Sequence, residues 1–182
     1  MLFWIAAALC VGAIWLRFFA GYEPAPAGIR ALGAHEYATV RAVGLVTFPP
    51  GGAVEPGADE AGVPAYVDRY VAAQPPAQRT LMRLLFFLVE HATVFFPPAG
   101  PAGMRRFTRL DASRQAQYLD GWGRSRLFPR RLVFSSLRAI VTMGFLADPG
   151  VRSRLELEPI AVTRAPSPAD DLWPPLDGAG LS

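Results

Sequence analysis

Lysine is absent from this chain, and histidine and cysteine are scarce. All 18 basic residues are Arg, and the 182 residues include only two His and one Cys. Without lysine the chain cannot form a Schiff base or complete a phosphate-binding P-loop. A single Cys excludes an intramolecular disulfide, a Cys-rich zinc site and an iron–sulfur cluster. These absences remove many of the side chains that carry enzymatic chemistry.

The sequence motifs of common enzyme classes are missing as well. There is no Gly-rich dinucleotide fingerprint, no Gly-x-Ser-x-Gly elbow and no Cys-x-x-Cys-His haem motif. The two histidines, His35 and His91, lie beside Glu36 and Glu90 on different predicted helices. A shared metal site would require those helices to converge, and two ordinary, partly buried histidines are the simpler interpretation. We therefore expect no catalytic residue, no cofactor and no metal site in this chain alone.

Charge is sparse and unevenly distributed along the chain. Charged residues make up 18% of the sequence, against roughly 25% in a typical soluble domain. Residues 105–154 carry 11 Arg and three acids, whereas residues 155–182 carry five acids and one Arg. This asymmetry indicates a partner surface, although Arg residues that solvate outer helix faces give the same pattern. No nucleic-acid-binding motif accompanies the Arg block, so we expect no nucleic-acid partner.

The longest apolar stretch lies at the N-terminus. Residues 2–16 read LFWIAAALCVGAIWL, and Arg17 follows. Residues 1–20 reach the roughly 20 apolar residues of a membrane-spanning helix if Arg17 extends to the interface. A cleavable secretory signal requires basic residues before its apolar stretch, and none precedes this one. We predict an uncleaved single-pass anchor in the inner (cytoplasmic) membrane, the alternative being a helix buried against a partner. The Arg residues that follow it favour a cytoplasmic body, with a periplasmic one left open.

Helical patterns separated by Pro- and Gly-rich turns fill the rest of the chain. Residues 21–33 form a linker rich in Pro, Gly and Ala, which cannot hold a helix. Apolar residues then recur at helical spacing, and no period-2 strand pattern is present. The predicted helices cover residues 34–47, 59–73 and 76–94, a segment after the N-cap Asp111, and a segment from Pro129 to Asp148. The predicted fold class is all-α: a small helical bundle at residues 34–155, with a transmembrane or buried N-terminal helix at residues 1–20 and an extended, Pro-rich acidic tail at residues 156–182.

Two stretches carry a resemblance to a known family. The first is FPPGG at residues 48–52 with AGVPAYVDRY at residues 61–70. The second comprises Arg106-Phe107-x-x-Leu110, Arg114, Leu119, Trp122, Ser125, Arg130-Arg131 and Ala147-Asp148-Pro149-x-Val151. The first resembles the gluconate 2-dehydrogenase small (gamma) subunit family, and the second a related small helical module associated with glucose–methanol–choline type flavin oxidoreductases. The chain departs from the pattern in having no Arg pair in its N-terminal stretch and Arg152-Ser-Arg-Leu-Glu after the last motif.

The resemblance implies a non-catalytic accessory subunit of a membrane-associated, flavin-dependent dehydrogenase. Such subunits carry no cofactor; they stabilise or anchor a large catalytic subunit that holds FAD, sometimes beside a cytochrome c. The alternative is a stand-alone, membrane-tethered helical scaffold with no redox partner. Arg pairs with carboxylates and packs on aromatic rings, so it suits a protein interface. We expect the partner contact at or near Arg106, Phe107, Trp122, Arg124, Arg130 and Arg131. Phe107 and Trp122 fit a core position equally well.

Overall fold

A computed structural model describes residues 1, 4, 11–12, 15–18, 20–98 and 101–157. All regular elements in these ranges are helical, so the all-α prediction is confirmed for the described part of the chain. The α-helices are α2 (Ala34–Thr47), α3 (Val63–Ala73), α4 (Pro76–His91), α5 (Ala112–Gly123), α6 (Phe128–Leu146) and α7 (Pro149–Arg154). The 3-10 helices are η1 (Ala92–Val94), η2 (Pro101–Met104) and η3 (Phe107–Arg109).

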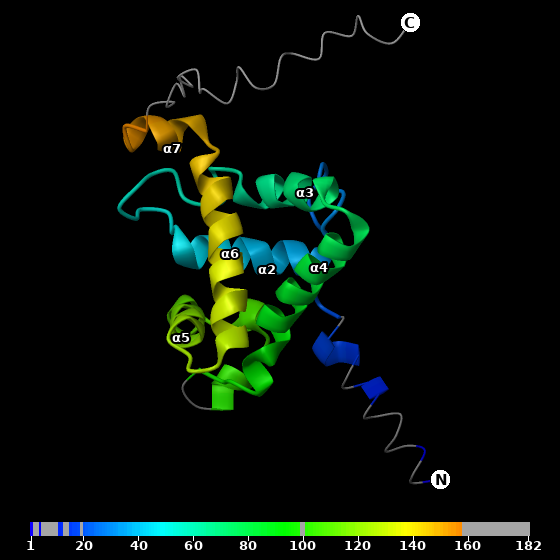
Figure 1. Ribbon diagram of the computed structural model, residues 1–182. Coiled ribbons are helices and arrows are strands. Elements are labelled where there is room, and N and C mark those ends of the chain that lie inside the picture. Colours follow the sequence, from blue (N-terminus) through cyan, green and yellow to red (C-terminus); the bar gives the residue numbers. More distant parts are fainter. Residues whose placement is uncertain (2–3, 5–10, 13–14, 19, 99–100, 158–182) are drawn as a thin grey trace, which may run out of the picture.

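Helix α2 lies at the centre of the bundle and packs against α3, α4, α5 and α6 (Figure 1). Most of its buried residues are small or β-branched, namely Thr39, Val40, Val43 and Gly44, and they let the neighbouring helices approach closely. One ring pair, Phe48 after α2 and Phe145 of α6, stacks with centroids 3.9 Å apart. The largest fully buried apolar side chains come from four of the helices and η3: Val40, Val43, Val63, Val67, Val71, Phe86, Val89, Phe107, Leu137, Val141 and Phe145.

Local sequence signals explain where most helices begin and end. The boundaries predicted for residues 34–47 match α2, because Gly33 precedes it and Pro49-Pro50 follow it. Helix α3 begins at Val63 rather than residue 59, since Gly62 adopts a left-handed conformation with φ of 69°. The helix predicted for residues 76–94 is α-helical to His91 and continues as η1.

Asp148-Pro149-Gly150 does more than end α6. The Asp148 carboxylate accepts a hydrogen bond from the backbone N–H of Val151 at 2.9 Å, and Pro149 occupies the first turn. The segment therefore starts α7, a helix that the sequence analysis did not predict.

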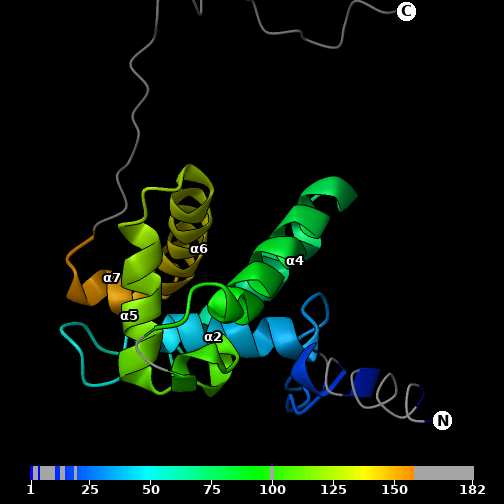
Figure 2. The ribbon, with the colours of Figure 1, turned by 90° about the horizontal axis from the view of Figure 1, so that it is seen from below.

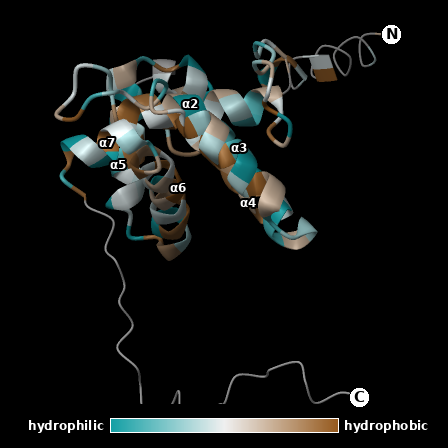
Figure 3. Cartoon of the chain, turned by 90° about the horizontal axis from the view of Figure 1, so that it is seen from above, coloured by the Kyte–Doolittle hydropathy of each residue, from teal (hydrophilic) through white to brown (hydrophobic). Residues whose placement is uncertain are grey.

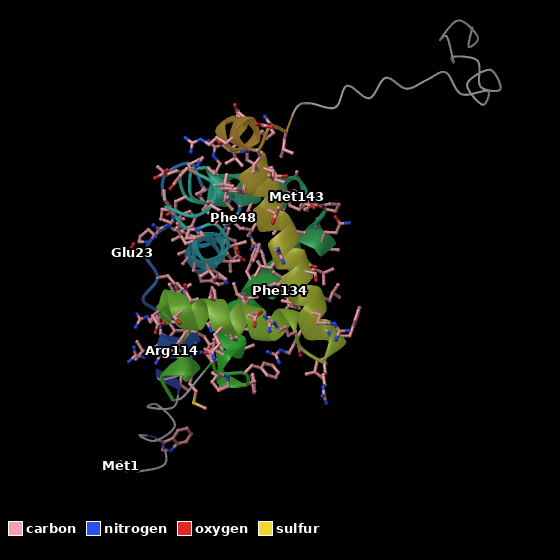
Figure 4. The ribbon with its side chains drawn as sticks, turned by 90° about the vertical axis from the view of Figure 1, so that its left-hand side faces the viewer. Met1, Glu23, Phe48, Arg114, Phe134 and Met143 are labelled. Carbon is pink, nitrogen blue, oxygen red and sulfur yellow. The ribbon has the colours of Figure 1, made fainter. Side chains whose placement is uncertain are left out.

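Helix α5 begins as predicted at its N-cap, Asp111, whose carboxylate accepts from the N–H of Arg114 at 2.9 Å. It continues through Gly121 and Gly123, although glycine is unfavourable in a helix. A Cβ atom on Gly123 would lie only 2.9 Å from the Phe134 ring of α6. Gly123 thus lets α5 and α6 pack closely where Phe134 lies between them (Figure 4).

The predicted anchor at residues 1–20 and the predicted tail at residues 156–182 lie mostly outside the described residues. Within the described part, residues 15–18 are helical and α7 is followed by residues 155–157. None of the described helices is long and apolar enough to cross a membrane.

Candidate functional site

A buried polar cluster, the Glu90 cluster, joins α4 to η3 and to the linker before α2. The Glu90 carboxylate is fully buried. Its Oε1 accepts hydrogen bonds from the hydroxyls of Tyr22 at 2.8 Å and Thr108 at 2.7 Å, and its Oε2 accepts from the Thr108 backbone N–H at 3.0 Å. The buried Arg106 guanidinium lies 4.0 Å from Glu90, donates to the Ala20 carbonyl at 2.6 Å and stacks over the Tyr22 ring at 4.3 Å.

Burial dominates the electrostatics of the Glu90 cluster. It raises the pKa of Glu90, while the hydrogen bonds from Thr108 and Tyr22 and the charge of Arg106 lower it in part. Burial and the neighbouring Glu90 also raise the pKa of Tyr22 far above its ordinary value. Because the carboxylate has no exposed surface and its oxygens already accept hydrogen bonds, a substrate cannot reach it. The cluster holds the linker on the bundle.

His91 lies next to this cluster and is neutral at pH 7. Its Nδ1 is 3.0 Å from a guanidinium nitrogen of Arg17, and guanidinium groups only donate, so Nδ1 accepts and the proton is on Nε2. Burial, followed by the charge of Arg17, lowers the pKa of His91 to about 4. Its Nε2 is buried and has no hydrogen-bond partner among the described residues. The rings of Phe18 and Phe87 lie 4.6 and 4.5 Å from the imidazole.

The two histidines form no joint metal site in the described part of the chain. His35 lies against the Tyr22 ring at 5.9 Å, while His91 contacts Arg17, which the sequence placed at a membrane interface. Within the described ranges, no group of three or more His, Cys, Asp or Glu side chains is arranged to hold a metal ion.

The acid of the AGVPAYVDRY stretch, Asp68, fixes the second half of the linker. Its Oδ1 accepts the backbone N–H groups of Ala31 at 2.8 Å, Leu32 at 2.9 Å and Arg30 at 3.1 Å, and its side chain is almost fully buried. Three consecutive amides converging on one carboxylate form a small anion-binding turn. The acid in this stretch therefore orients the chain that enters α2.

The predicted partner-contact residues separate into an inner and an outer set. Arg106, Phe107 and Trp122 are buried within the bundle, so Phe107 and Trp122 take the core position that the sequence left open. Phe107 and Trp122 both pack on the ring of Tyr118, with centroids 5.6 and 5.4 Å away. This inner set stabilises the fold from within.

The outer set lies where α5 turns into α6. The Arg124 side chain is exposed and pairs with Asp120 at 2.9 Å. Arg131 donates to two carbonyl groups of the turn, those of Ser125 at 2.8 Å and Arg126 at 3.1 Å. Both side chains can therefore reach solvent or a partner.

Arg130 links the outer set to the core. Its guanidinium lies 4.0 Å from the Phe96 ring centroid and 5.2 Å from that of Trp122. The structure thus brings Trp122 and Arg130 together, whereas Arg106 lies in the Glu90 cluster.

Two separate hollows beside α4 and α6, which the sequence analysis missed, are lined largely by apolar side chains. We call them together the α4/α6 groove. The first has a volume of about 440 Å³ and is lined by Phe18, Phe87, Leu88, Phe96, Trp122 and Val133, among others. The second has a volume of about 420 Å³ and is lined by Leu81, Met82, Leu85, Ala139, Ile140 and Met143, among others. The LLFFLV run of α4 is the sequence feature that could have indicated these hollows, since a helix segment that is apolar all round needs neighbours on every side.

These features define a small all-helical protein whose buried ionisable groups hold its own fold and which leaves an apolar groove open. The chain belongs to the gluconate 2-dehydrogenase subunit 3 family, whose model matches residues 34–162, more than half of its length. The match confirms the resemblance found in the sequence, and it implies an accessory subunit of a dehydrogenase complex. Neither a curated protein nor a solved structure matches the chain.

Proposed function

We propose that this protein is the non-catalytic small subunit of a membrane-associated, flavin-dependent dehydrogenase, where it stabilises or anchors the catalytic subunit that carries FAD. Family membership over residues 34–162 carries this proposal. The structure supports it in one respect: Glu90 and Arg106, the ionisable residues at the centre of the described bundle, are buried and bonded within the chain. Chemistry on a substrate is then the task of another subunit.

The parts of the chain divide this work between them. Residues 34–155 form the accessory domain, residues 21–33 the linker and residues 156–182 an acidic tail. Residues 1–20 anchor the complex in the inner (cytoplasmic) membrane, with the body on the cytoplasmic side. The partner is a large flavoprotein of the glucose–methanol–choline type, in some complexes accompanied by a cytochrome c.

The outer set of Arg residues belongs to the proposed contact. Arg124 and Arg131 are accessible at the α5–α6 turn, and Arg130 lies on an aromatic base of Phe96 and Trp122. An Arg held on aromatic rings loses little side-chain freedom when it pairs with a carboxylate. Arg106 and Phe107 support this surface indirectly, by holding η3 in the bundle.

Purification of the tagged full chain from its native host in mild detergent tests the proposal. The expected result is a yellow preparation in which a flavoprotein of larger mass co-purifies and reduces an electron acceptor when substrate is added. Recovery of the chain alone, colourless and stably folded, would favour the stand-alone scaffold and reject the proposed function. Extraction of the membrane fraction with alkaline carbonate, which releases peripheral proteins only, tests the anchor separately.

A further inference from the structure

We infer that the end of the bundle next to residues 1–20 rests on the membrane surface, where lipid acyl chains cover an apolar hollow and anionic head groups bind the Arg residues beside it. The hollow is the first of the α4/α6 groove, the one that Phe18 lines, and is called the Phe18 hollow below. The inference deepens the proposed function and rests on the anchor within it, because that anchor brings this end of the bundle to the lipid.

The Phe18 hollow is apolar and exposed at its rim. Trp122, which lines it, is buried in the core, but four other lining residues are exposed: Phe95 to 79%, Leu127 to 54%, and Leu88 and Val94 to a smaller extent. Apolar residues recur along α4 and α6, the two helices that contribute to the lining, as Figure 3 shows. Monomeric proteins rarely leave contiguous apolar surface uncovered, and such surface marks a site for a protein or a membrane.

The position of Phe18 favours a membrane as the molecule that covers the hollow. Phe18 comes two residues after the apolar run that ends at Leu16. Its ring lies 6.0 Å from that of Phe87 and 4.6 Å from that of His91, both of which line the same hollow. Because a helix rises only about 1.5 Å per residue, an anchor that ends near Leu16 places the hollow at the level of the lipid surface.

Arg17 ties the end of the anchor to the bundle. Its guanidinium donates to His91 Nδ1 at 3.0 Å, to the Thr93 hydroxyl at 3.2 Å and to the Met104 carbonyl at 3.4 Å. These contacts join the segment to α4, η1 and η2, so the hollow cannot turn away from the anchor without breaking them. Figure 2 looks onto this end and shows the N-terminal segment beside the chain that follows α4, whereas α7 lies at the opposite end in Figure 1.

The charge beside the hollow favours anionic lipid. Residues 92–110 contain three Arg and no acid. Arg106 is bound within the Glu90 cluster, but Arg105 is exposed and follows Met104, which is 51% exposed. Neither Arg17 nor Arg105 has an ion-pair partner among the described residues, so their charges are not neutralised. Anionic lipid surfaces attract basic residues that lie next to a membrane segment.

The proposed partner contact begins at the other side of the hollow. Arg130 lines the hollow where it meets the α5–α6 turn, while Arg124 and Arg131 of that turn do not line it. A flavoprotein bound at Arg124 and Arg131 and a lipid surface over the hollow can therefore be held side by side.

Fluorescence quenching in lipid vesicles tests the inference on the full chain. Cys10→Ser removes the only native Cys, and Leu16→Cys, Phe95→Cys or Leu157→Cys then carries the environment-sensitive dye NBD. Leu16 reports the anchor, and Leu157, which is 47% exposed and lies beyond α7, is the control. The vesicles contain phosphatidylcholine, phosphatidylglycerol and a lipid with a nitroxide quencher on its acyl chain. We expect the nitroxide lipid to lower the emission of the labels at 16 and 95 and to leave the label at 157 unchanged.

Each other pattern of quenching overturns the inference. Quenching at 16 but not at 95 means that the anchor is in the membrane and the bundle is not. Quenching at neither position rejects the anchor as well, and equal quenching at all three positions means that no particular end of the bundle faces the lipid. A label at 95 that lipid does not quench, but that the bound flavoprotein or a second copy of the chain shields from aqueous iodide, assigns the hollow to that protein instead.

Substitutions separate the apolar part of the surface from its charge. In the chain labelled at Phe95→Cys, Leu127→Asp and Arg105→Glu should each lower the ratio of membrane-inserted to water-exposed label at least about fivefold. The matched controls at the opposite end, Leu157→Asp and Arg154→Glu, should leave that ratio unchanged. The effect of Arg105→Glu should also disappear in vesicles of phosphatidylcholine alone. Circular dichroism confirms that each variant folds, and equal effects of the test and control variants would overturn the inference.

Co-purification from the native host keeps this inference apart from the accessory function. If the wild-type chain recovers a flavoprotein and lipid quenches the label at 95, both stand. If it recovers a flavoprotein and the label is not quenched, the accessory function remains and the membrane-facing surface is rejected. If it recovers no flavoprotein, the accessory function is rejected, and the vesicles, which contain no flavoprotein, still decide whether the bundle rests on lipid.

Discussion

Replacing the buried Asp68 with Ala should destabilise the fold strongly, because its carboxylate holds the linker that enters α2. The carboxylate accepts the backbone N–H groups of Arg30, Ala31 and Leu32, at 3.1, 2.8 and 2.9 Å. It supplies three of the bonds that hold the turn leading into α2, beside one from Arg83 of α4 to the Ala31 carbonyl at 2.9 Å.

The size of the effect follows from these bonds. Hydrogen bonds to charged groups contribute about 1.5–3 kcal/mol each, and a buried donor left unpaired costs about 1–3 kcal/mol. The Leu32 bond is buried, and those of Arg30 and Ala31 are part-buried, where water can replace the carboxylate. We therefore expect Asp68→Ala to lower the free energy of unfolding by about 3–4 kcal/mol. Asp68→Asn keeps one acceptor oxygen but no charge, and should cost about half as much.

Urea denaturation followed by far-ultraviolet circular dichroism measures the loss, and hydrogen exchange locates it. In the Ala variant the amides of residues 30–32 should lose protection first. Asp59→Ala is the control, because its salt bridge with Arg41 is largely exposed and should contribute at most about 1 kcal/mol. If Asp68→Ala costs no more than this control, the carboxylate is not the anchor of the linker.

Three further predictions test the packing of the bundle, each with a control variant. The pKa of His91 is about 6.5 in the unfolded chain and about 4 in the folded protein, so the unfolded state binds the proton more tightly. The free energy of unfolding should therefore be highest above pH 6.5 and should fall by up to about 3 kcal/mol as the pH is lowered toward 4. Urea denaturation at several pH values measures this decline, which His91→Gln should lack. Gly121→Ala should stabilise the protein by about 0.5–1 kcal/mol, because alanine favours a helix and open space surrounds Gly121. Gly123→Ala should destabilise it by about 1 kcal/mol, because the added methyl group meets the Phe134 ring of α6. Equal melting temperatures for the two variants would contradict the close approach of α5 and α6. Glu90→Ala should lower the free energy of unfolding, measured in urea, by about 3–5 kcal/mol, because it leaves the buried Arg106 without its carboxylate. Arg124→Ala is the control: Arg124 pairs with Asp120 on the exposed surface, so its loss should change that free energy by at most about 0.5 kcal/mol.

Local signals in the sequence predicted most of the helical architecture, because Pro-rich turns and helix caps lie within a few residues of the helix ends. Glycine alone was a poorer guide, since α5 continues through Gly121 and Gly123. The boundaries of α2 and the cap at Asp111 follow from residues within a few positions. The helix after Asp148 was missed because Asp-Pro-Gly is as typical of a turn as of a helix start. Short-range patterns were insufficient wherever the answer depended on a distant neighbour.

The candidate site shows the same limit. Arg106 was expected at or near a partner contact and Phe107 either there or in the core; both are buried, because the chain at η3 turns inward against α4 and α5. Helical spacing could not decide whether Trp122 faced the core or a partner, and it lies in the core beneath Arg130. The LLFFLV run of α4 indicates more apolar surface than a small bundle covers, but the place of the α4/α6 groove depends on how α6 crosses α4, which that run does not encode.

Two of the buried carboxylates, Glu90 and Asp68, constrain how the N-terminal segment meets the bundle. Glu90 and Asp68 fix the linker at both ends, through Tyr22 and through residues 30–32, so the chain leading to Ala20 has a defined direction. Phe18, two residues further toward the N-terminus, lines one end of the groove. The N-terminal segment and the bundle therefore share the lining of one hollow. If residues 1–20 anchor the complex in a membrane, the rigid linker sets the distance between that membrane and the bound subunit, and loosening it at Asp68 should weaken membrane attachment of the partner without removing the groove.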